Sequence, residues 1–258
     1  MKSSIYTEER RKEILSLLQR QKRVSVNELN KLYQVSGTTI RLDLAALEKK
    51  GLLVRTHGGA VLPESSDLFV EPVISERHHE DEKSRIAKAA LNFLVPDETI
   101  LLDTGTTLSI FADIFCRNVS MHQTVYSNDL HVLQILESSD SCELHMLGGK
   151  IRSGFHYSYG TQVINEMSCY HFKKFFLATS AFSMGDLTTT SSDLAALKRS
   201  MIDASEQVIL LVDSSKFDII GFQKFADLSD IDVVITDTGI DDANLKYLQE
   251  HVKTVITA

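Results

Sequence analysis

Four short segments combine hydroxyl, glycine and basic residues in a way that suits the binding of a phosphate group. The first, Asp103–Thr107, follows the apolar run Thr99–Leu102. Backbone N–H groups around Gly105, the hydroxyls of Thr106 and Thr107 and the start of a helix would together form a cradle for an anion. A plain turn with threonine as the helix cap explains the same residues, so both interpretations stay open.

Two further segments also follow apolar runs. Asn128 comes after the run 124–126, and its side chain could donate a hydrogen bond to a sugar hydroxyl. Gly148 and Gly149 follow the run 144–147 and precede two basic residues, Lys150 and Arg152, that suit a phosphate. The glycine pair fits a plain hairpin equally well.

The fourth segment, Asp213–Phe217, places Lys216 beside strand-end hydroxyls after the run 208–212. Lys198 lies on a predicted helix before that run and could equally be a surface lysine. The predicted effector ligands are therefore Asp103, Gly105, Thr106, Thr107, Asn128, Gly149, Lys150, Arg152, Lys198, Asp213 and Lys216.

A second chemistry, the recognition of DNA, is predicted near the N-terminus. Serine and threonine hydroxyls suit phosphate oxygens and base edges, and arginine can pair bidentately with guanine. Helix-turn-helix proteins insert the N-terminal end of their second helix into the major groove. The residues expected at that end are Ser36, Gly37, Thr38, Thr39 and Arg41. A helix cap and a glycine-rich turn add Ser25, Arg55, His57, Gly58 and Gly59.

The elements that must position these residues begin with two helices. Residues 8–20 have the apolar spacing of an amphipathic helix. Ser25 and Glu28 have the spacing of a capping box at the start of the next helix, Val26–Tyr33. This second helix should bury three apolar residues: Val26, Leu29 and Leu32.

A third helix and a wing complete the predicted DNA-binding unit. Ser36 should cap a helix that runs to about Lys50, and Gly51 should end it. Residues 52–55 and 60–62 are predicted as two short strands around a glycine turn. Wings of this kind commonly lie along the phosphate backbone, which glycines allow to come close.

The distribution of charge supports a DNA partner although the whole chain carries a net charge of -8. Residues 1–62 hold 12 of the 27 Lys and Arg but only 6 of the 35 Asp and Glu, so their net charge is +6. The remaining residues carry -14. A basic module on an acidic body is typical of a DNA-binding protein. A small helical domain that binds another protein, as in an adaptor, is the alternative.

The rest of the chain predicts an α/β domain. Apolar strand-like runs alternate with helical segments from Lys83 to the C-terminus, a pattern that favours a largely parallel sheet. In such sheets, ligands bind beyond the carboxyl ends of the strands, where the four segments lie. We therefore expect a DNA-binding domain in 1–62, a linker in 63–82 and an effector-binding domain in 83–258.

No cofactor or metal is predicted. The three cysteines, Cys116, Cys142 and Cys169, are widely spaced and lack a CxxC pair, which suggests reduced thiols in the cytoplasm. The adjacent His78 and His79 could bind a metal, but no third and fourth ligand spacing accompanies them, so a solvated helix start is favoured. The sequence shows no signal peptide and no transmembrane run.

The first part of the chain resembles the DeoR family of bacterial regulators. The family shows Val-Ser, Thr-Ile-Arg-Arg-Asp-Leu, Leu-Glu, Gly, Arg and His-Gly-Gly-Ala. Here these motifs are matched by residues 35–36, 39–44, 47–48, 51, 55 and 57–60. Leu42 replaces the second arginine of the pair, which removes one possible phosphate contact or base reader.

The body resembles the effector domain of the same family. That domain shows Asp-x-Gly-Thr-Thr, an Asn, a Gly-Gly loop with Arg, and Asp-x-Ser-Lys-Phe, matched here by 103–107, Asn128, 148–152 and 213–217. The resemblance implies a fold similar to ribose-5-phosphate isomerase and a sensor of phosphorylated sugars. Ala178 and Ala181 lie where the family usually has glycines and often an acid, so we expect a more crowded pocket floor.

The sequence and the resemblance together predict a sequence-specific transcriptional regulator, most often a repressor of a carbohydrate operon in this family. Operator DNA and a phosphorylated sugar would be its partners. Two heads reading a palindrome would require a homodimer or homotetramer. A sugar-phosphate isomerase is the rival hypothesis, but the stretch 176–182 contains no acid to act as the base.

Overall fold

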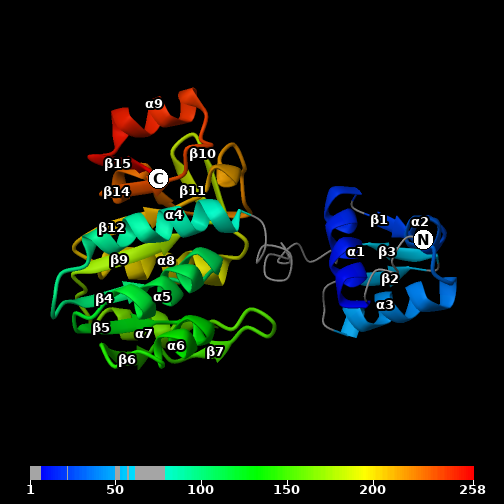
Figure 1. The fold of residues 1–258 in the computed structure, drawn as a ribbon, viewed down its shortest axis with the longest axis horizontal. Helices are drawn as coiled ribbons and strands as arrows, with labels where there is room; N and C mark the ends of the chain where they lie inside the picture. Colours follow the sequence, from blue (N-terminus) through cyan, green and yellow to red (C-terminus); the bar gives the residue numbers. More distant parts are fainter. Residues whose placement is uncertain (1–6, 22, 50–52, 57, 62–78) are drawn as a thin grey trace. The chain divides into compact units, whose positions relative to one another are not determined.

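The computed structural model describes residues 7–21, 23–49, 53–56, 58–61 and 79–258. It divides into two compact units, residues 1–78 and 79–258 (Figure 1). Most of the predicted linker lies outside the described residues. Its last three residues, 80–82, form the first turn of a helix, so the second unit begins slightly earlier than the expected residue 83.

The smaller unit is a helix-turn-helix with a three-stranded antiparallel sheet. Its elements are α1 (Thr7–Gln21), β1 (Arg23–Ser25), α2 (Val26–Tyr33), α3 (Gly37–Lys49), β2 (Val54–Thr56) and β3 (Gly59–Val61). The strand order is β1-β3-β2. The two strands β2 and β3 confirm the predicted wing. The sequence analysis missed β1, because a three-residue strand with one buried side chain, Val24, has no recognisable periodicity.

The core of this unit corrects one prediction. Leu32 is 58% exposed, and the buried residues of α2 are Val26, Leu29 and Tyr33. Residues spaced i, i+3 and i+7 share one helix face, whereas Leu32 lies to the side of that face. Gly51, expected to end α3, and His57, expected in the wing, lie outside the described residues.

The larger unit confirms the predicted α/β fold with a parallel sheet. Its seven strands are β4 (Thr99–Leu102), β5 (Gln123–Ser127), β6 (Cys142–Met146), β9 (Lys174–Ala178), β12 (Val208–Leu211), β14 (Val233–Thr236) and β15 (Thr254–Thr257). They lie in the order β15-β14-β12-β9-β4-β5-β6, and every pairing is parallel. The central strands β4, β9, β12 and β14 are buried along almost their whole length, as expected for a sheet that is covered on both sides.

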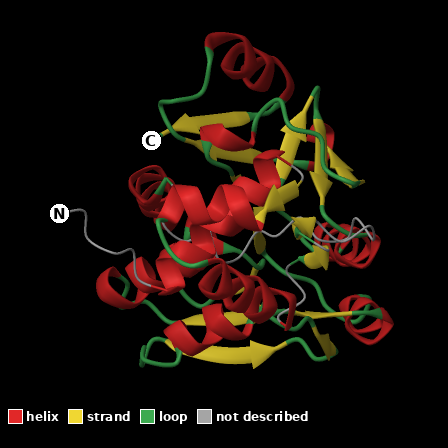
Figure 2. Cartoon of the chain, turned by 90° about the vertical axis from the view of Figure 1, so that its right-hand side faces the viewer, coloured by secondary structure: helices red, strands yellow, loops and turns green. Residues whose placement is uncertain are grey.

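Helices cover both faces of the sheet (Figures 1 and 2). One face packs against α4 (Glu80–Ala90), α5 (Thr106–Asn118) and α6 (Leu130–Leu136). The other packs against α7 (Thr161–Met167), α8 (Ser192–Asp203) and α9 (Asp242–His251). Alternate residues of β4 point to opposite faces of the sheet. Leu101 packs in the core on the side of α7, α8 and α9, and Leu102 packs in the core on the side of α4, α5 and α6. The ends of the strands are thereby fixed on a rigid scaffold.

Two small antiparallel pieces flank the main sheet. A hairpin joins β7 (Lys150–Ile151) to β8 (Ser158–Tyr159). A three-stranded sheet contains β10 (Ala181–Ser183), β11 (Asp186–Thr189) and β13 (Gln223–Asp227). Strands this short, formed partly between distant residues, leave little signal in the sequence.

The described residues offer no group of three or more His, Cys, Asp and Glu side chains that could hold a metal ion. Cys116, Cys142 and Cys169 are all free thiols, and burial raises the pKa of Cys142 to about 11. None of the described helices is long and apolar enough to cross a membrane.

Candidate DNA interface and effector site

The predicted recognition residues lie in the first two turns of α3. Oγ of Ser36 accepts a hydrogen bond from the backbone N–H of Thr39 at 3.1 Å, which confirms Ser36 as the helix cap. The helix buries Ile40, Leu44 and Leu47 in the core of the smaller unit. Thr38 and Arg41 are exposed. The N-terminal end of α3 thus presents hydroxyl and guanidinium groups to solvent.

Asp43, also on α3, is a buried residue that our sequence analysis did not single out. Its two carboxylate oxygens accept hydrogen bonds from Nε of Arg10 at 2.7 Å and Nε of Arg11 at 2.9 Å, both on α1. Asp43 and Arg10 are almost fully buried. The acid of the Thr-Ile-Arg-Leu-Asp-Leu segment therefore fixes the recognition helix on α1.

Ser25 has a structural role as the cap of α2. Its Oγ accepts from the backbone N–H of Glu28 at 3.2 Å, and the Glu28 carboxylate accepts from the backbone N–H of Ser25 at 3.1 Å. This confirms the capping box. The hydrogen bond that Oγ of Ser25 donates to the Glu28 carboxylate at 2.8 Å, and then the one from the backbone N–H of Ser25, hold the pKa of Glu28 below its usual value.

Arg55 links the wing to the recognition helix. Its backbone N–H donates to Glu48 at 3.0 Å, and its Nε donates to the other Glu48 oxygen at 2.8 Å. These hydrogen bonds, that of the backbone first, hold the pKa of the Glu48 carboxyl below its usual value. Arg55 remains partly exposed, so its guanidinium can also face a phosphate.

The two described glycines of the wing differ in their surroundings. A Cβ at Gly59 would lie 1.9 Å from the carbonyl oxygen of Val24 and 2.8 Å from Cα of Ser25. The close pairing of β1 with β3 therefore requires a glycine at this position. A Cβ at Gly58 would meet no atom within 4 Å. No close contact with the described residues requires a glycine at position 58.

We expect Gly59→Ala to lower the free energy of unfolding by about 1–3 kcal/mol, the usual cost of an overpacked core. Gly58→Ala should leave stability unchanged and weaken DNA binding, because the added methyl group would hinder close approach of the phosphate backbone. Urea denaturation and fluorescence anisotropy with labelled DNA measure the two effects. Equal stability of the two variants would contradict the role assigned to Gly59.

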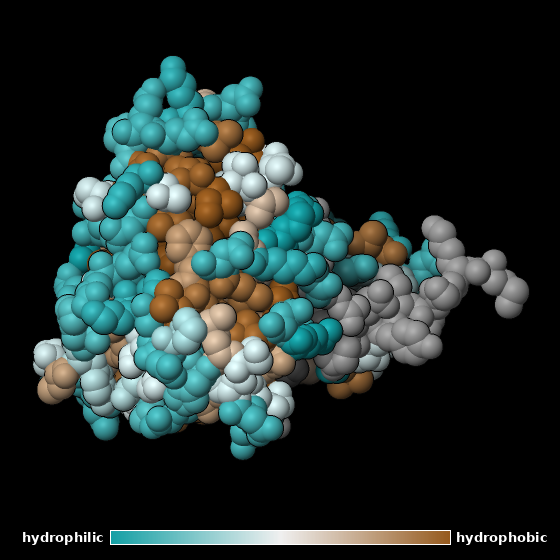
Figure 3. Space-filling model, turned by 60° about the vertical axis from the view of Figure 1, so that its left-hand side comes forward, coloured by the Kyte–Doolittle hydropathy of each residue, from teal (hydrophilic) through white to brown (hydrophobic). Residues whose placement is uncertain are grey.

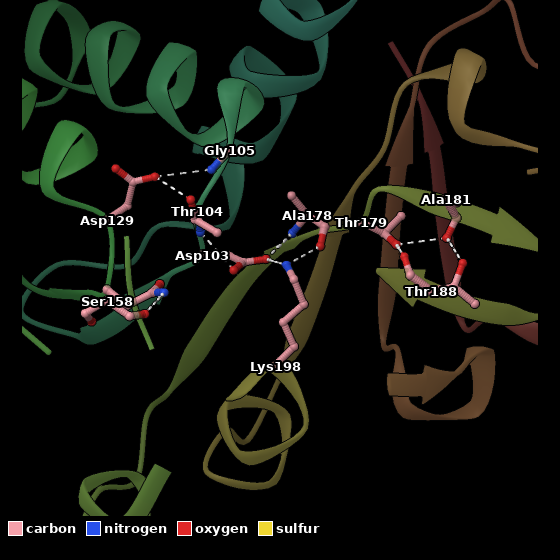
Figure 4. Close-up of polar contacts among 11 residues, drawn as sticks. Asp103, Thr104, Gly105, Asp129, Ser158, Ala178, Thr179, Ala181, Thr188 and Lys198 are labelled. Carbon is pink, nitrogen blue, oxygen red and sulfur yellow. Dashed lines mark hydrogen bonds and ion pairs between the residues drawn. The ribbon is translucent and has the colours of Figure 1, made fainter. Parts of the chain in front are cut away.

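At the carboxyl end of the parallel sheet, Asp103 and Lys198 form a buried ion pair (Figure 4). Asp103 also accepts from the backbone N–H groups of Thr104 at 2.8 Å and Ala178 at 3.0 Å. Nζ of Lys198 donates to the carbonyl oxygen of Ala178 at 2.9 Å. Lys198 is not a surface lysine: with Asp103 it ties β4, β9 and α8 together.

Asp129, which our sequence analysis did not select, joins the ends of β4 and β5 (Figure 4). One carboxylate oxygen caps α6 by accepting from the N–H of His131 at 2.8 Å. The other accepts from Oγ1 of Thr104 at 2.6 Å and from the N–H of Gly105 at 3.4 Å. The predicted anion cradle thus already contacts one carboxylate of the protein.

Asn128 is fully buried beside this network. Its Nδ2 donates one of its two hydrogens to the carbonyl oxygen of Ser158 at 3.0 Å. Its Oδ1 is buried and has no hydrogen-bond partner among the described residues. The side chain therefore keeps an unused acceptor, and the expected donation to a sugar hydroxyl stays a prediction.

The glycine pair lies between β6 and β7, whereas the hairpin joins β7 to β8, so the glycines are not the turn of a hairpin. Gly149 has φ +145°, and a Cβ there would lie 2.8 Å from the carbonyl oxygen of Tyr159. The ammonium of Lys150 lies 5.6 Å from the ring centre of Tyr159, and the guanidinium of Arg152 lies 5.0 Å from that of Phe155. Both basic residues therefore lie on or next to the β7–β8 hairpin, over aromatic rings.

The segment after β12 forms a short 3-10 helix, Ser214–Lys216. Asp213 is buried and accepts from the N–H of Ser215 at 3.1 Å. A further acid, Asp237, accepts from the N–H of Ser214 at 2.6 Å and of Gly239 at 2.8 Å. Lys216 is half-buried.

The four predicted segments follow strands of one sheet. The hydrogen bonds above join the ends of β4, β5 and β9 to one another, and they connect the hairpin through Ser158. Lys216 lies after β12, the neighbour of β9. Gly105 has φ +132° and begins α5 without a side-chain cap. Of the expected ligands, Thr106 and Thr107 lie in the first turn of this helix.

Together, the smaller unit defines a helix-turn-helix DNA-binding module and the larger a ligand-sensing α/β domain. Residues 10–66 match the family model described as the DeoR-like helix-turn-helix domain, and residues 78–238 match the DeoR C terminal sensor domain. The chain therefore belongs to the DeoR family of transcriptional regulators. Family membership confirms the prediction of a DNA-binding regulator rather than an enzyme.

Two relatives that are more than 30% identical to this chain agree with this assignment. The chain is 35% identical to the "Putative aga operon transcriptional repressor" of Escherichia coli O157:H7, over 95% of this chain and 91% of the relative. It is 32% identical to the "Lactose phosphotransferase system repressor" of Streptococcus mutans, over 96% and 98%. Ribose 5 phosphate isomerase A from Neisseria gonorrhoeae matches 54% of each chain with a TM-score of 0.40 and 18% identity.

Proposed function

We propose that this protein represses a carbohydrate-metabolism operon and that a phosphorylated sugar, or a related metabolite, modulates its binding to the operator. The names of its relatives support the type of operon. A ligand that binds better to one arrangement of the regulator than to the other changes operator affinity by its differential binding energy, typically about 1–3 kcal/mol. The regulator would act in the bacterial cytoplasm, on the nucleoid when bound to DNA.

The observation that carries the effector site is the buried, unpartnered Oδ1 of Asn128 beside the uncapped start of α5. A buried acceptor without a donor is unfavourable, and a sugar hydroxyl would satisfy it. The first N–H groups of α5, with the hydroxyls of Thr106 and Thr107, suit the phosphate.

The ion pairs of the site bear on which residue would supply the positive charge for a phosphate. Lys198 is neutralised by Asp103, and the Asp129 carboxylate already contacts the Thr104–Gly105 loop. Positive charge for a phosphate must therefore come from other residues, and Lys216, Lys150 and Arg152 are the candidates. We assign Lys216 this role because it follows β12 at the same edge of the sheet.

We expect variants of the two units to affect different properties. Variants of the larger unit should change the response to the effector, and variants of the smaller unit should change operator binding. Lys216→Ala and Thr106→Ala should weaken the response to the effector and retain operator binding. Arg41→Ala should weaken operator binding and leave ligand binding intact, because its guanidinium is exposed on α3.

A thermal-shift screen against phosphorylated sugars identifies the ligand, since a ligand that binds the folded state raises the melting temperature. Anisotropy titrations with operator DNA then give the dose–response curve.

An unchanged dose–response curve in both effector-site variants would place the pocket elsewhere. An unchanged operator affinity in Arg41→Ala would refute the assignment of this side chain. Turnover of a pentose or hexose phosphate by the wild-type protein would contradict a purely sensory domain.

We also propose that the protein is a homodimer or homotetramer, since two heads are needed to read a palindromic operator. Apolar side chains gather in a stripe on one face of the larger unit (Figure 3). Separately, four exposed apolar residues flank the β10–β11–β13 sheet: Met184, Ile219, Ile220 and Phe222. Exposed apolar clusters often mark protein contacts. A monomer that binds its operator at full strength would contradict this proposal.

A further inference from the structure

The outward face of α3 has a composition that is unusual for a DNA-contacting helix. The inward face consists of Ile40, Asp43, Leu44 and Leu47, all at most 3% exposed. At about 100° of rotation per residue, the positions opposite that face within residues 37–47 of the helix are 38, 42 and 45. They hold Thr38, Leu42 and Ala45. Each of these side chains ends in a methyl group or carries one.

Leu42 dominates this outward face. It is 65% exposed, although its neighbours in sequence, Arg41 and Asp43, are polar. A single exposed leucine is common on protein surfaces. This one, however, lies at the centre of the helix face that a helix-turn-helix protein inserts into the major groove, within a module of net charge +6.

The chemistry of the major groove specifies what a leucine can recognise there. Its isobutyl group can neither donate to nor accept from base edges, and it cannot pair with a phosphate. Among the groups that the four base pairs present in the major groove, the C5-methyl of thymine is the apolar one. Burial of a methyl group against an apolar side chain is favourable, whereas burial of a polar base edge there is not.

We propose that Leu42 reads a thymine by packing on its C5-methyl group, with the methyl groups of Thr38 and Ala45 beside it. Arg41, which precedes Leu42 and folds back to within 3.5 Å of the Cβ position at Gly37, would flank this contact on the N-terminal side. Specificity at this base pair then comes from an apolar contact instead of a charged one.

The test uses a duplex selected by the wild-type protein from a random DNA pool. Each thymine is replaced in turn by deoxyuridine, which removes only the C5-methyl group. We expect one thymine in each half-site at which the replacement weakens wild-type binding about fourfold, the value of one buried methyl group. Leu42→Ala should bind the unmodified duplex more weakly and show no loss on replacement of that thymine.

Leu32→Ala is the matched control, since Leu32 is a comparably exposed leucine on α2. It should keep both the affinity and the sensitivity to deoxyuridine. Both leucines are exposed, so neither variant should lose stability, and thermal unfolding checks this. Equal sensitivity of wild type and Leu42→Ala at every thymine would overturn the proposal. Leu42→Arg offers a second readout: one added phosphate contact should steepen the slope of log K against log[salt] by about 0.9.

Discussion

Replacement of Asp43 by alanine is expected to lower the free energy of unfolding of the smaller unit by about 3–5 kcal/mol, the usual cost of removing one partner from a buried ion pair. The variant would remove the carboxylate that accepts from Nε of Arg10 and from Nε of Arg11, and the guanidinium of Arg10 is almost fully buried. Small domains have a free energy of unfolding of only about 5–15 kcal/mol, so this loss should largely unfold the smaller unit at moderate temperature.

Urea denaturation of the full chain followed by circular dichroism measures the effect, and DNA binding should be lost in parallel. Glu48→Gln is the control. It removes the negative charge that pairs with Arg55, and this ion pair is solvent-exposed, so stability should change little. If Asp43→Ala unfolds at the same urea concentration as the wild type, the ion pairs on α1 do not hold α3.

The second large effect is expected from Lys198→Met in the larger unit. Methionine keeps much of the volume of lysine but leaves the Asp103 carboxylate, which is fully buried, without its counter-charge. Removal of one partner of such a pair costs about 3–5 kcal/mol. The carbonyl oxygen of Ala178 would also lose a donor. The unfolding transition of the larger unit should shift strongly, while that of the smaller unit should not.

The double variant Asp103→Asn with Lys198→Met separates charge from packing. It should recover part of the lost stability, because a neutral pair of similar volume removes the buried charge. Lys173→Met is the matched control, since Lys173 pairs with Glu206 at the surface and its loss should have little effect. A double variant no more stable than Lys198→Met would show that the loss arises from packing.

Local signals in the sequence were sufficient for much of the fold. The capping box joins Ser25 and Glu28, which are three residues apart, and the predicted apolar run 99–102 matches the bounds of β4. Contacts between residues that are far apart in the chain could not be predicted from such local signals. Asp43 and Arg10 are 33 residues apart, and Asp129 and Thr104 are 25 apart, so no local pattern links them.

Large sequence separation also explains why the sequence did not show that several predicted site residues contact distant parts of the protein. Gly59 is required by the neighbouring strand β1, and Asp103 is held by Lys198, 95 residues away. Sequence spacing identified the segments at the carboxyl ends of the strands. It did not indicate which side chains point into the protein and which remain available to a ligand, since that depends on the packing of α8 and of the hairpin.

The division of α3 into two faces has a consequence for the history of such regulators. Asp43 and its apolar neighbours are constrained by the fold, whereas Thr38 and Leu42, on the opposite side of the helix, are exposed. After a gene duplication, substitutions at these two outward positions could accumulate at little cost in stability. One copy could then acquire a new operator while the other kept the old one, so that related regulators in one cell control separate genes without cross-talk.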